Sequence, residues 1–144
     1  MNVEFVYSTN MSVISKGRGY VYSIQYHVVW CVKYRHKVLE GEIERTLHNI
    51  LLDVAGGNGF KISEFNCDKD HVHLLLDCKP QHYIPDMIKG LKGVSGRLLM
   101  KEYGDELRLK LWGGHLWSPS YFVATVSENT EKQIREYIRN QKEG

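Results

Sequence analysis

The chain has 144 residues, which is enough for one well-packed domain and short for two. Its 42% hydrophobic and 25% charged residues are ordinary for a globular protein, and no apolar run approaches the roughly 20 residues that cross a bilayer. The net charge of +2 is too small to indicate nucleic-acid binding by itself. Three cysteines without a Cys-x-x-Cys pair argue against a disulfide scaffold. With no secretion signal, they predict a cytoplasmic location and no membrane partner.

The first half of the chain contains one predicted strand and one predicted helix. Residues 1–16 show no periodicity and are predicted to form a loose leader before a single domain over residues 17–144. Tyr, Val and Ile residues predict a strand over 17–34. Apolar residues at helical spacing predict a helix over 41–55, which the run Gly56-Gly57-Asn58-Gly59 ends.

The second half contains three predicted strands and two predicted helices. Strands are predicted over 60–66 and 71–78, and the short turn between them predicts an antiparallel hairpin. A helix is predicted over 83–103, followed by a loop and a last strand over 121–126. The final helix is predicted over 130–142.

This order of elements defines the predicted fold class. The series β-α-β-β-α-β with an extra C-terminal helix predicts an α+β, ferredoxin-like or RRM-like fold, in which two helices cover one face of an antiparallel sheet. Such a sheet leaves its other face free. Within the helix over 83–103, Gly90, Gly93 and Gly96 lie three apart and predict a thin face that another segment approaches closely.

A histidine pair lies on the strand predicted over 71–78. His71 and His73 flank Val72, so their imidazoles project from one face of the strand, which is the face opposite the helices. Two imidazoles on a stiff strand can hold a metal ion if a third ligand is supplied. Imidazole together with a hard oxygen ligand favours Mg²⁺ or Mn²⁺ over structural zinc. The alternative is that these histidines are surface residues hydrogen-bonded to their neighbours.

The final helix offers a possible third ligand and a nucleophile. Tyr137 and Gln141 lie one turn apart, within one arc of the helix that also holds Ile134 and Ile138. The carbonyl oxygen of Gln141 can ligate a hard cation, and Tyr137 would lie beside it. A phenol with a pKa near 10 is a weak nucleophile, and a cation on a phosphodiester would assist its attack. The alternative is an amphipathic helix that packs its tyrosine in an apolar stripe.

Basic residues gather in two stretches and are candidate contacts to DNA phosphates. They are Lys33, Arg35, Lys37, Lys89, Lys92 and Arg97. Aromatic rings such as Tyr34 or Trp112 could stack on extruded bases. The alternatives are that the cations form a solvated surface and that the rings pack in the core.

Together these segments resemble the HUH single-tyrosine transposases of bacterial insertion sequences, the TnpA-like family. The motif His-hydrophobic-His alone is weakly specific, whereas all the motifs in this order are highly specific. The resemblance covers residues 17–141 and is carried by Tyr26-His27-Val28-Val29-Trp30-Cys31-Val32-Lys33-Tyr34-Arg35, Asp70-His71-Val72-His73-Leu74-Leu75, Leu91-Lys92-Gly93, Leu111-Trp112-Gly113, Trp117-Ser118-Pro119-Ser120-Tyr121-Phe122 and Tyr137-Ile138-Arg139-Asn140-Gln141.

The resemblance implies a role for each matching residue. His71, His73 and Gln141 would hold Mg²⁺ or Mn²⁺, and Tyr137 would be the nucleophile. The implied activity is that of a DNA transposase: it recognises hairpins at the ends of the mobile element, cleaves single-stranded DNA and transfers the strand through a 5′-phosphotyrosine. Family members are homodimers in which the tyrosine helix of one subunit can complete the metal site of the other.

Two other functions stay open at this stage. A non-catalytic RRM-like module would bind single-stranded nucleic acid across its uncovered sheet face, although histidines then occupy the central strand where stacking aromatics are expected. A domesticated single-strand nuclease would use the same chemistry as the transposase for a host function, and the sequence does not separate the two.

Overall fold

The computed structural model describes residues 24–111, 113–126 and 130–141. The predicted leader over 1–16, the first part of the predicted strand over 17–34, Trp112 and the predicted end of the final helix lie outside these residues. No helix in the described part of the chain combines the length and the apolar character that a membrane span requires.

A four-stranded antiparallel sheet forms the centre of the molecule. Its strands are β1 (Ile24–Cys31), β2 (Lys61–Cys67), β3 (His71–Cys78) and β4 (Phe122–Thr125), in the spatial order β2-β3-β1-β4. Every neighbouring pair is antiparallel, and β2 and β3 form the predicted hairpin. The predicted α+β, ferredoxin-like arrangement is confirmed. Because β3 has a strand on each side, its side chains are held in a fixed register.

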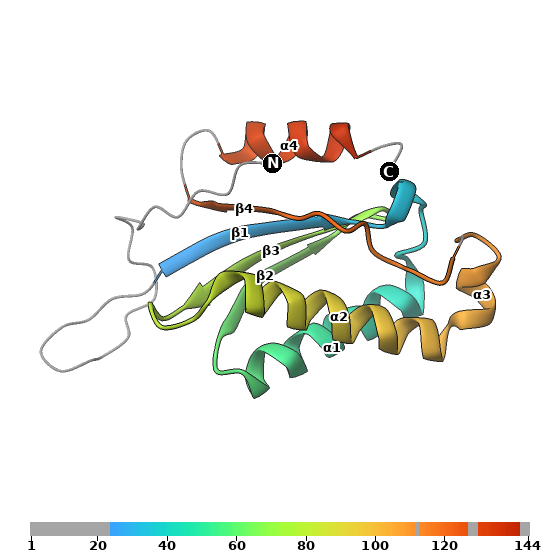
Figure 1. Ribbon diagram of the computed structural model, residues 1–144, viewed down its shortest axis with the longest axis horizontal. Coiled ribbons are helices and arrows are strands. Elements are labelled where there is room, and N and C mark those ends of the chain that lie inside the picture. Colours follow the sequence, from blue (N-terminus) through green and yellow to red (C-terminus); the bar gives the residue numbers. More distant parts are fainter. Residues whose placement is uncertain (1–23, 112, 127–129, 142–144) are drawn as a thin grey trace, which may run out of the picture.

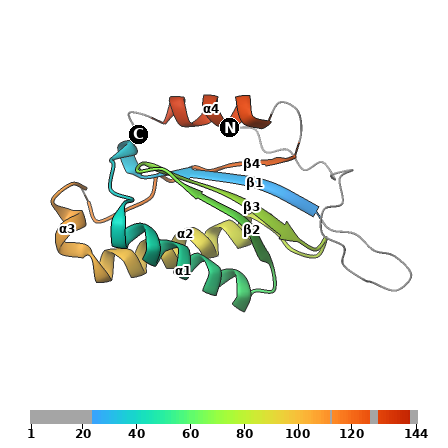
Figure 2. The ribbon, with the colours of Figure 1, turned by 180° about the vertical axis from the view of Figure 1, so that it is seen from behind.

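Helices lie on both faces of the sheet (Figures 1 and 2). One face is covered by α1 (Gly41–Gly57) and α2 (Ile84–Glu102), and a short helix α3 (Gly104–Arg108) follows α2. The final helix α4 (Thr130–Asn140) lies over the opposite face, which we call the α4 face. The expectation of a free second face is therefore wrong: the apolar side of α4 packs on β1 and β4, and covers part of that face. The helix ends one residue before Gln141, which was predicted to lie within it; Gln141 N instead donates to Ile138 O in a closing turn.

Side chains of β3 alternate between the two faces as the sequence predicts. Val72, Leu74 and Leu76 are fully buried in the core beneath α1 and α2. His71 and His73 are half-buried and have the opposite orientation, toward the α4 face. The period of two along this strand therefore places both imidazoles on the side of the sheet that carries α4.

The first strand ends earlier than predicted. β1 ends at Cys31, and a short 3-10 turn over Lys33–Arg35 follows. Tyr34 and Arg35 both adopt positive φ angles, of 56° and 54°. Two successive non-glycine residues in the left-handed region cost about 1 kcal/mol or more each, and nothing in their residue types predicts this conformation. The turn directs Arg35 back toward the start of β3.

Trp117 packs closely against the glycine face of α2 at Gly96. A Cβ atom at Gly96 would be 3.1 Å from Cδ1 of Trp117, whereas one at Gly93 would meet nothing within 4 Å. The indole Nε1 of Trp117 donates to Ser95 Oγ at 3.0 Å. The expected close approach is confirmed at Gly96, and it fixes the segment that carries Ser118 beside the end of β1.

Candidate active site

The histidine half of the candidate site is built by the pairing of β1 with β3. In the register of these strands, Cys31 is paired with His71 and Val29 with His73. Paired residues on antiparallel strands project from the same face with Cβ atoms about 5 Å apart. The imidazoles therefore lie one strand away from the patch of β1 on which α4 packs.

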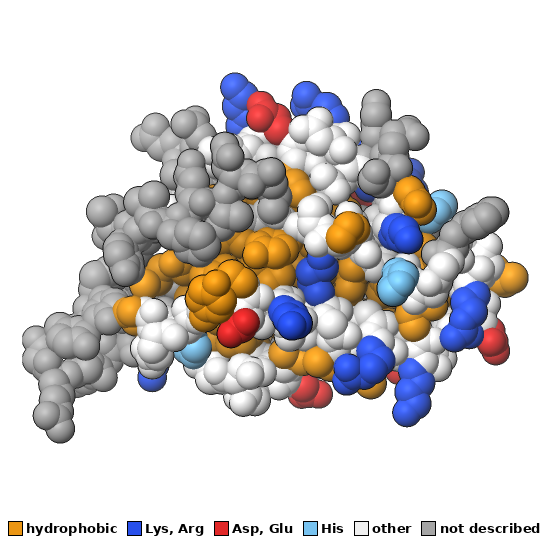
Figure 3. Space-filling view, viewed as in Figure 1, with side chains coloured by type: hydrophobic (Ala, Val, Ile, Leu, Met, Phe, Trp, Pro, Cys, Tyr) orange, Lys and Arg blue, Asp and Glu red, His pale blue; other side chains and the backbone are white. Residues whose placement is uncertain are grey.

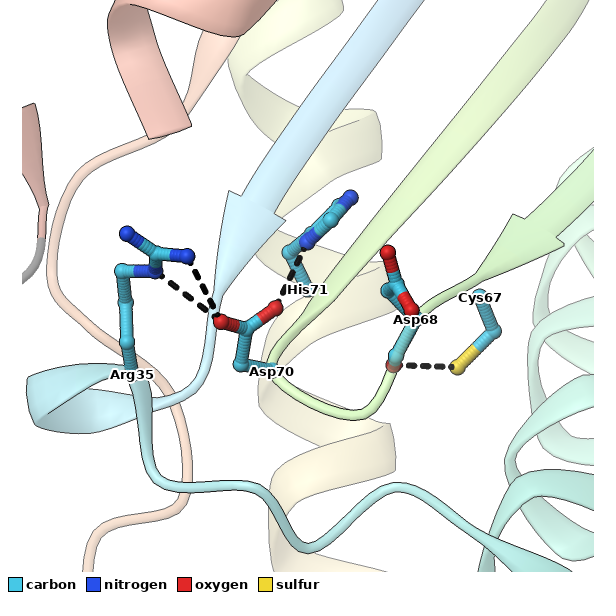
Figure 4. Close-up of polar contacts among 5 residues, drawn as sticks. All are labelled: Arg35, Cys67, Asp68, Asp70 and His71. Carbon is cyan, nitrogen blue, oxygen red and sulfur yellow. Dashed lines mark hydrogen bonds and ion pairs between the residues drawn. The ribbon is translucent and has the colours of Figure 1, made fainter. Parts of the chain in front are cut away.

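His71 is held by a carboxylate, and that carboxylate is held by a guanidinium (Figure 4). Asp70 Oδ1 lies 2.8 Å from His71 Nδ1, and Asp70 Oδ2 lies 2.9 Å from Arg35 Nη2 and 3.0 Å from Arg35 Nε. Burial raises the pKa of Asp70, but hydrogen bonds from His71 and Arg35 outweigh burial, and the net pKa is lowered. An ionised carboxylate only accepts, so His71 Nδ1 carries the proton. The lone pair of a neutral His71 is then on Nε2.

His73 has a different partner, a third histidine. His27 Nδ1 lies 2.8 Å from His73 Nε2, and the ring centroids are 5.0 Å apart. Burial and then the charge of His73 lower the pKa of His27 to about 4, and burial followed by His71 lowers that of His73. No role was predicted for His27 from the sequence. Its position in the strand places it on the α4 face, but only the register of β1 against β3 brings it to His73.

The tyrosine half of the site rests on a small apolar cluster. Tyr137 is 6% exposed and is buried with Ile134 of its own helix against Val29, Cys31 and Phe122. Its hydroxyl lies 2.8 Å from Ser120 Oγ. The net pKa of Tyr137 is raised to about 12, mainly by burial. The hydrogen bond with Ser120 partly offsets this increase, and the nearby Cys31 adds to it. In this arrangement the phenol keeps its proton at neutral pH.

Two serines hold Gln141 beside the tyrosine. Gln141 Oε1 accepts from Ser120 Oγ at 3.0 Å and from Ser118 Oγ at 3.3 Å. The ammonium of Lys92 donates to the backbone carbonyls of Ser118 and Ser120, at 2.7 Å and 2.9 Å. The Ser118–Ser120 segment therefore links α2 to α4. The segment belongs to one of the motifs that carry the family resemblance, but no role was predicted for its hydroxyls.

The two halves share one face of the sheet, but each has its own hydrogen-bond partners. The described residues contain no group of three His, Cys, Asp or Glu side chains that could hold a metal ion. Two imidazoles therefore need a ligand of another type. A glutamine carbonyl oxygen on the same face fits a hard divalent cation, once Gln141 exchanges its serine partners for the cation.

The predicted phosphate contacts occupy different surroundings. Lys33, Lys92 and Arg97 line a cavity of about 870 Å³ between α2 and the segment over 114–119. Lys37 and Arg35 line a smaller cavity of about 300 Å³ beside His71. Lys89 is exposed on α2. In Figure 3, Lys and Arg side chains gather over the α2 and α3 end of the visible face.

Arg35 and Lys92 are engaged within the protein in this structure. Arg35 forms the ion pair with Asp70, and Lys92 binds the two serine carbonyls. Burial lowers the pKa of Lys92 to about 8. Neither cation is part of a fully solvated surface, so both differ from the exposed Lys37, Lys89 and Arg97. Tyr34, an expected stacking ring, is 45% exposed, and Lys33 Nζ lies 5.5 Å from its centroid.

Comparison with known proteins shows the family to which the chain belongs. The family model for IS200-like transposases matches residues 20–141, which is most of the chain. The chain therefore belongs to the IS200-like transposase family, as the motifs indicate. It is a DNA transposase, an enzyme that cuts DNA and transfers the strand. Transposases of this family generally use a divalent metal ion.

Individual relatives give the same result. The chain is 53% identical over 128 residues to the ISDra2 transposase TnpA of Deinococcus radiodurans, covering 89% of this chain and 91% of that protein. It is 34% identical over 122 residues to the IS200 transposase of Salmonella typhimurium, covering 85% and 79% of the two chains.

Solved structures agree on the fold. A crystal structure of a transposase candidate from Deinococcus radiodurans R1 superposes with a TM-score of 0.83 at 48% identity, covering 90% of this chain and 99% of that one. A REP-associated tyrosine transposase bound to a REP hairpin superposes with a TM-score of 0.55 at 11% identity, covering 94% of this chain and 75% of that one. The second similarity supports the fold alone.

Proposed function

We propose that this transposase cleaves single-stranded DNA by attack of Tyr137 on a phosphodiester, at a site where His71, His73 and Gln141 hold Mg²⁺ or Mn²⁺. The observation that carries the proposal is the register of the sheet. Tyr137 is buried against Val29 and Cys31, the β1 residues that pair with His73 and His71. The proposed nucleophile therefore packs on β1, next to the strand β3 that carries both imidazoles, on the α4 face of the sheet.

The proposed step exchanges one phosphoester bond for another. The Tyr137 oxygen forms a bond to phosphorus, the bond from phosphorus to the 3′-oxygen breaks, and the phenol proton ends on the departing 3′-hydroxyl. The 5′-phosphate stays on Tyr137 as a phosphotyrosine, and a 3′-hydroxyl of another strand reverses the exchange. Because the phosphoester bond is conserved, rejoining needs no nucleotide cofactor.

A divalent cation, when bound, would stabilise the charge that develops on the phosphate during attack. The residues of the chain prepare the site for it. Asp70 keeps the proton of His71 on Nδ1, and the serine pair holds the oxygen of Gln141 next to the Tyr137 hydroxyl. Imidazole and amide oxygen ligands suit magnesium or manganese, and the proposal includes either.

The proposed DNA partner is a single strand folded into a hairpin at the end of a mobile element, and the proposed place of action is the cytoplasm. A tyrosine transposase with a similar fold is bound to a REP hairpin. In this chain the exposed cations Lys37, Lys89 and Arg97 are the best candidates for phosphate contacts. They lie on α2 and on the loop that precedes α1, outside the hydrogen-bond networks that hold the site.

We also propose a homodimer with shared sites. Within the described chain, Tyr137 and Gln141 bind serines while the imidazoles bind Asp70 and His27. A tyrosine helix from a second copy would supply the missing ligand and nucleophile. Mixing two inactive variants, Tyr137→Phe and His71→Ala, is expected to restore cleavage. Restoration fails if each chain must supply both halves of its own site.

The test of the function is adduct formation. The full chain is incubated with single-stranded hairpin DNA and Mn²⁺ and run on a denaturing gel. We expect a covalent protein–DNA species that Tyr137→Phe eliminates while hairpin binding is retained. Tyr83→Phe, which changes an exposed tyrosine at the start of α2, is the matched control and retains the adduct. An adduct that survives Tyr137→Phe assigns the nucleophile elsewhere.

A further inference from the structure

We infer that Asp70 and Arg35 are positioning residues for the metal site: Arg35 fixes the Asp70 carboxylate, and that carboxylate fixes the tautomer and orientation of His71. The inference rests on the proposed function in one respect, the role of His71 as a ligand. It also changes the expected role of Arg35, from a contact to DNA phosphate to a support for the site.

The geometry of the three groups supports this role. The carboxylate of Asp70 uses one oxygen for His71 and the other for Arg35 (Figure 4). Its side chain is 9% exposed, so few water molecules can compete for either oxygen. The second nitrogen of the His71 ring lies on the far side from Asp70, and that nitrogen has the lone pair when Nδ1 is protonated. The pattern is that of a carboxylate, a histidine and a metal in line.

The backbone supports the same conclusion. Arg35 contacts Asp70 from a turn in which Tyr34 and Arg35 both adopt left-handed conformations, at φ 56° and 54°. The turn is fixed from both sides: Arg35 N donates to Val32 O at 2.8 Å, and Val32 N donates to Asp70 O at 2.9 Å. Such conformations in non-glycine residues concentrate at functional sites.

The main experiment measures the tautomer of His71 directly. Nitrogen-15 NMR of the metal-free full chain reports which ring nitrogen carries the proton. We expect Nδ1 protonated in the wild type and a shift of the proton toward Nε2 in Asp70→Ala. Asp53→Asn, which removes an exposed carboxylate on α1, is the control and leaves His71 unchanged. If His71 already carries its proton on Nε2 in the wild type, the inference is wrong.

Metal binding provides the second measurement. Manganese titration followed by electron paramagnetic resonance is expected to give an affinity about 10 to 100-fold weaker in Asp70→Ala than in the wild type. Asp70→Asn retains an oxygen that accepts from Nδ1 and should recover part of that loss. If His71→Ala leaves manganese affinity unchanged, the proposed function fails. If His71→Ala weakens binding and Asp70→Ala does not, only the present inference fails.

The role of Arg35 is separated from DNA binding by the salt dependence of hairpin affinity. Losing one phosphate contact to a single strand reduces the slope of log affinity against log salt by about 0.7. We expect that reduction for Lys37→Gln, whereas Arg35→Gln keeps the wild-type slope and weakens manganese binding. The opposite pattern makes Arg35 a phosphate contact. If Arg35→Gln does not fold, the double variant Arg35→Gln/Asp70→Asn, which removes both charges together, is measured instead. We expect it to keep the wild-type salt slope and to bind manganese more weakly, and a slope reduced by about 0.7 would make Arg35 a phosphate contact.

Discussion

The two halves of the site differ in how they are held. His71 and His73 belong to a strand with a neighbour on each side, and each ring has a side-chain partner within 2.8 Å. Tyr137 lies on the final helix and Gln141 directly follows it, and this part of the chain rests on one small apolar cluster and on the hydroxyls of Ser118 and Ser120. In the proposed site, the sheet therefore provides a fixed half that would bind the metal, and the helix provides a half that could be exchanged.

This difference has a consequence for catalysis. The oxygen of Gln141 already has two hydroxyl donors, and the raised pKa of Tyr137 keeps its proton in place. In the proposed site, His71 would bind the cation through its second ring nitrogen and His73 would give up His27, whereas Tyr137 and Gln141 would first have to leave their serine partners. A terminal helix that moves as a unit, within one chain or between two, satisfies that requirement.

The largest expected effect is on the fixed half. His71→Ala should abolish hairpin cleavage even at high manganese concentration, because a methyl group would replace the proposed ligand on a strand that is paired on both sides. His48→Gln, on α1 behind the opposite face, is the control and should cleave normally. Single-turnover cleavage with a denaturing gel measures both. Normal cleavage by His71→Ala would show that the sheet supplies no essential ligand.

The support of the tyrosine half depends on Lys92. Burial lowers its pKa to about 8 from 10.5 in the unfolded chain. Between these values the unfolded chain binds more protons, so the folded state gains stability as pH rises, by up to roughly 3 kcal/mol. Relative to Lys92→Met, the wild type should become more stable from about pH 8 to about pH 10.5, with no change below pH 8. Urea unfolding at each pH measures the free energy of unfolding of both proteins. If the difference between them does not change with pH, the Lys92 ammonium is solvated and its pKa is not lowered by burial.

Removing one serine should loosen only the exchangeable half. Ser120→Ala leaves the Tyr137 hydroxyl and the Gln141 oxygen without their shared partner, at a cost of roughly 1–2 kcal/mol. Hydrogen exchange is expected to accelerate in α4 and to stay unchanged in β3. Ser120→Thr retains the hydroxyl and serves as the control. Equal acceleration in both elements would mean that the halves are not separable.

The smallest effect concerns the contact between α2 and Trp117. Gly93→Ala should stabilise the helix by about 0.5–1 kcal/mol, because its added methyl group meets open space. Gly96→Ala should be less stable than Gly93→Ala by about 1–2 kcal/mol, because the methyl group would lie 3.1 Å from the indole. Thermal unfolding compares the two, and equal stability would show that the indole moves aside freely.

The fixed half was also the more predictable one. Side-chain alternation with a period of two is enough to place Val72 in the core and His71 and His73 on the other face. The family motifs then predict DNA transposition, which the comparisons confirm. The order of elements was predictable for the same reason, since hydrophobic period, glycine runs and turn residues are local signals.

Interactions between distant segments were not predictable. The left-handed turn at Tyr34 and Arg35 has no signature in residue type, so a continuous strand was expected there. The charges of Arg35 and Lys92 suggested phosphate contacts, whereas their present partners, Asp70 and the serine carbonyls, are brought close only by the tertiary fold. Helical periodicity likewise gives the apolar side of α4 but not the face of the sheet on which it rests.

The most direct test of the account identifies the residue that becomes attached to DNA. The covalent species formed with hairpin DNA and manganese is digested, and mass spectrometry locates the bound nucleotide. We predict a 5′-phosphodeoxynucleotide on the peptide that contains Tyr137, and its disappearance when His71 is replaced by alanine. Attachment at any other side chain would contradict the claim that the terminal helix and the histidine strand form one active site.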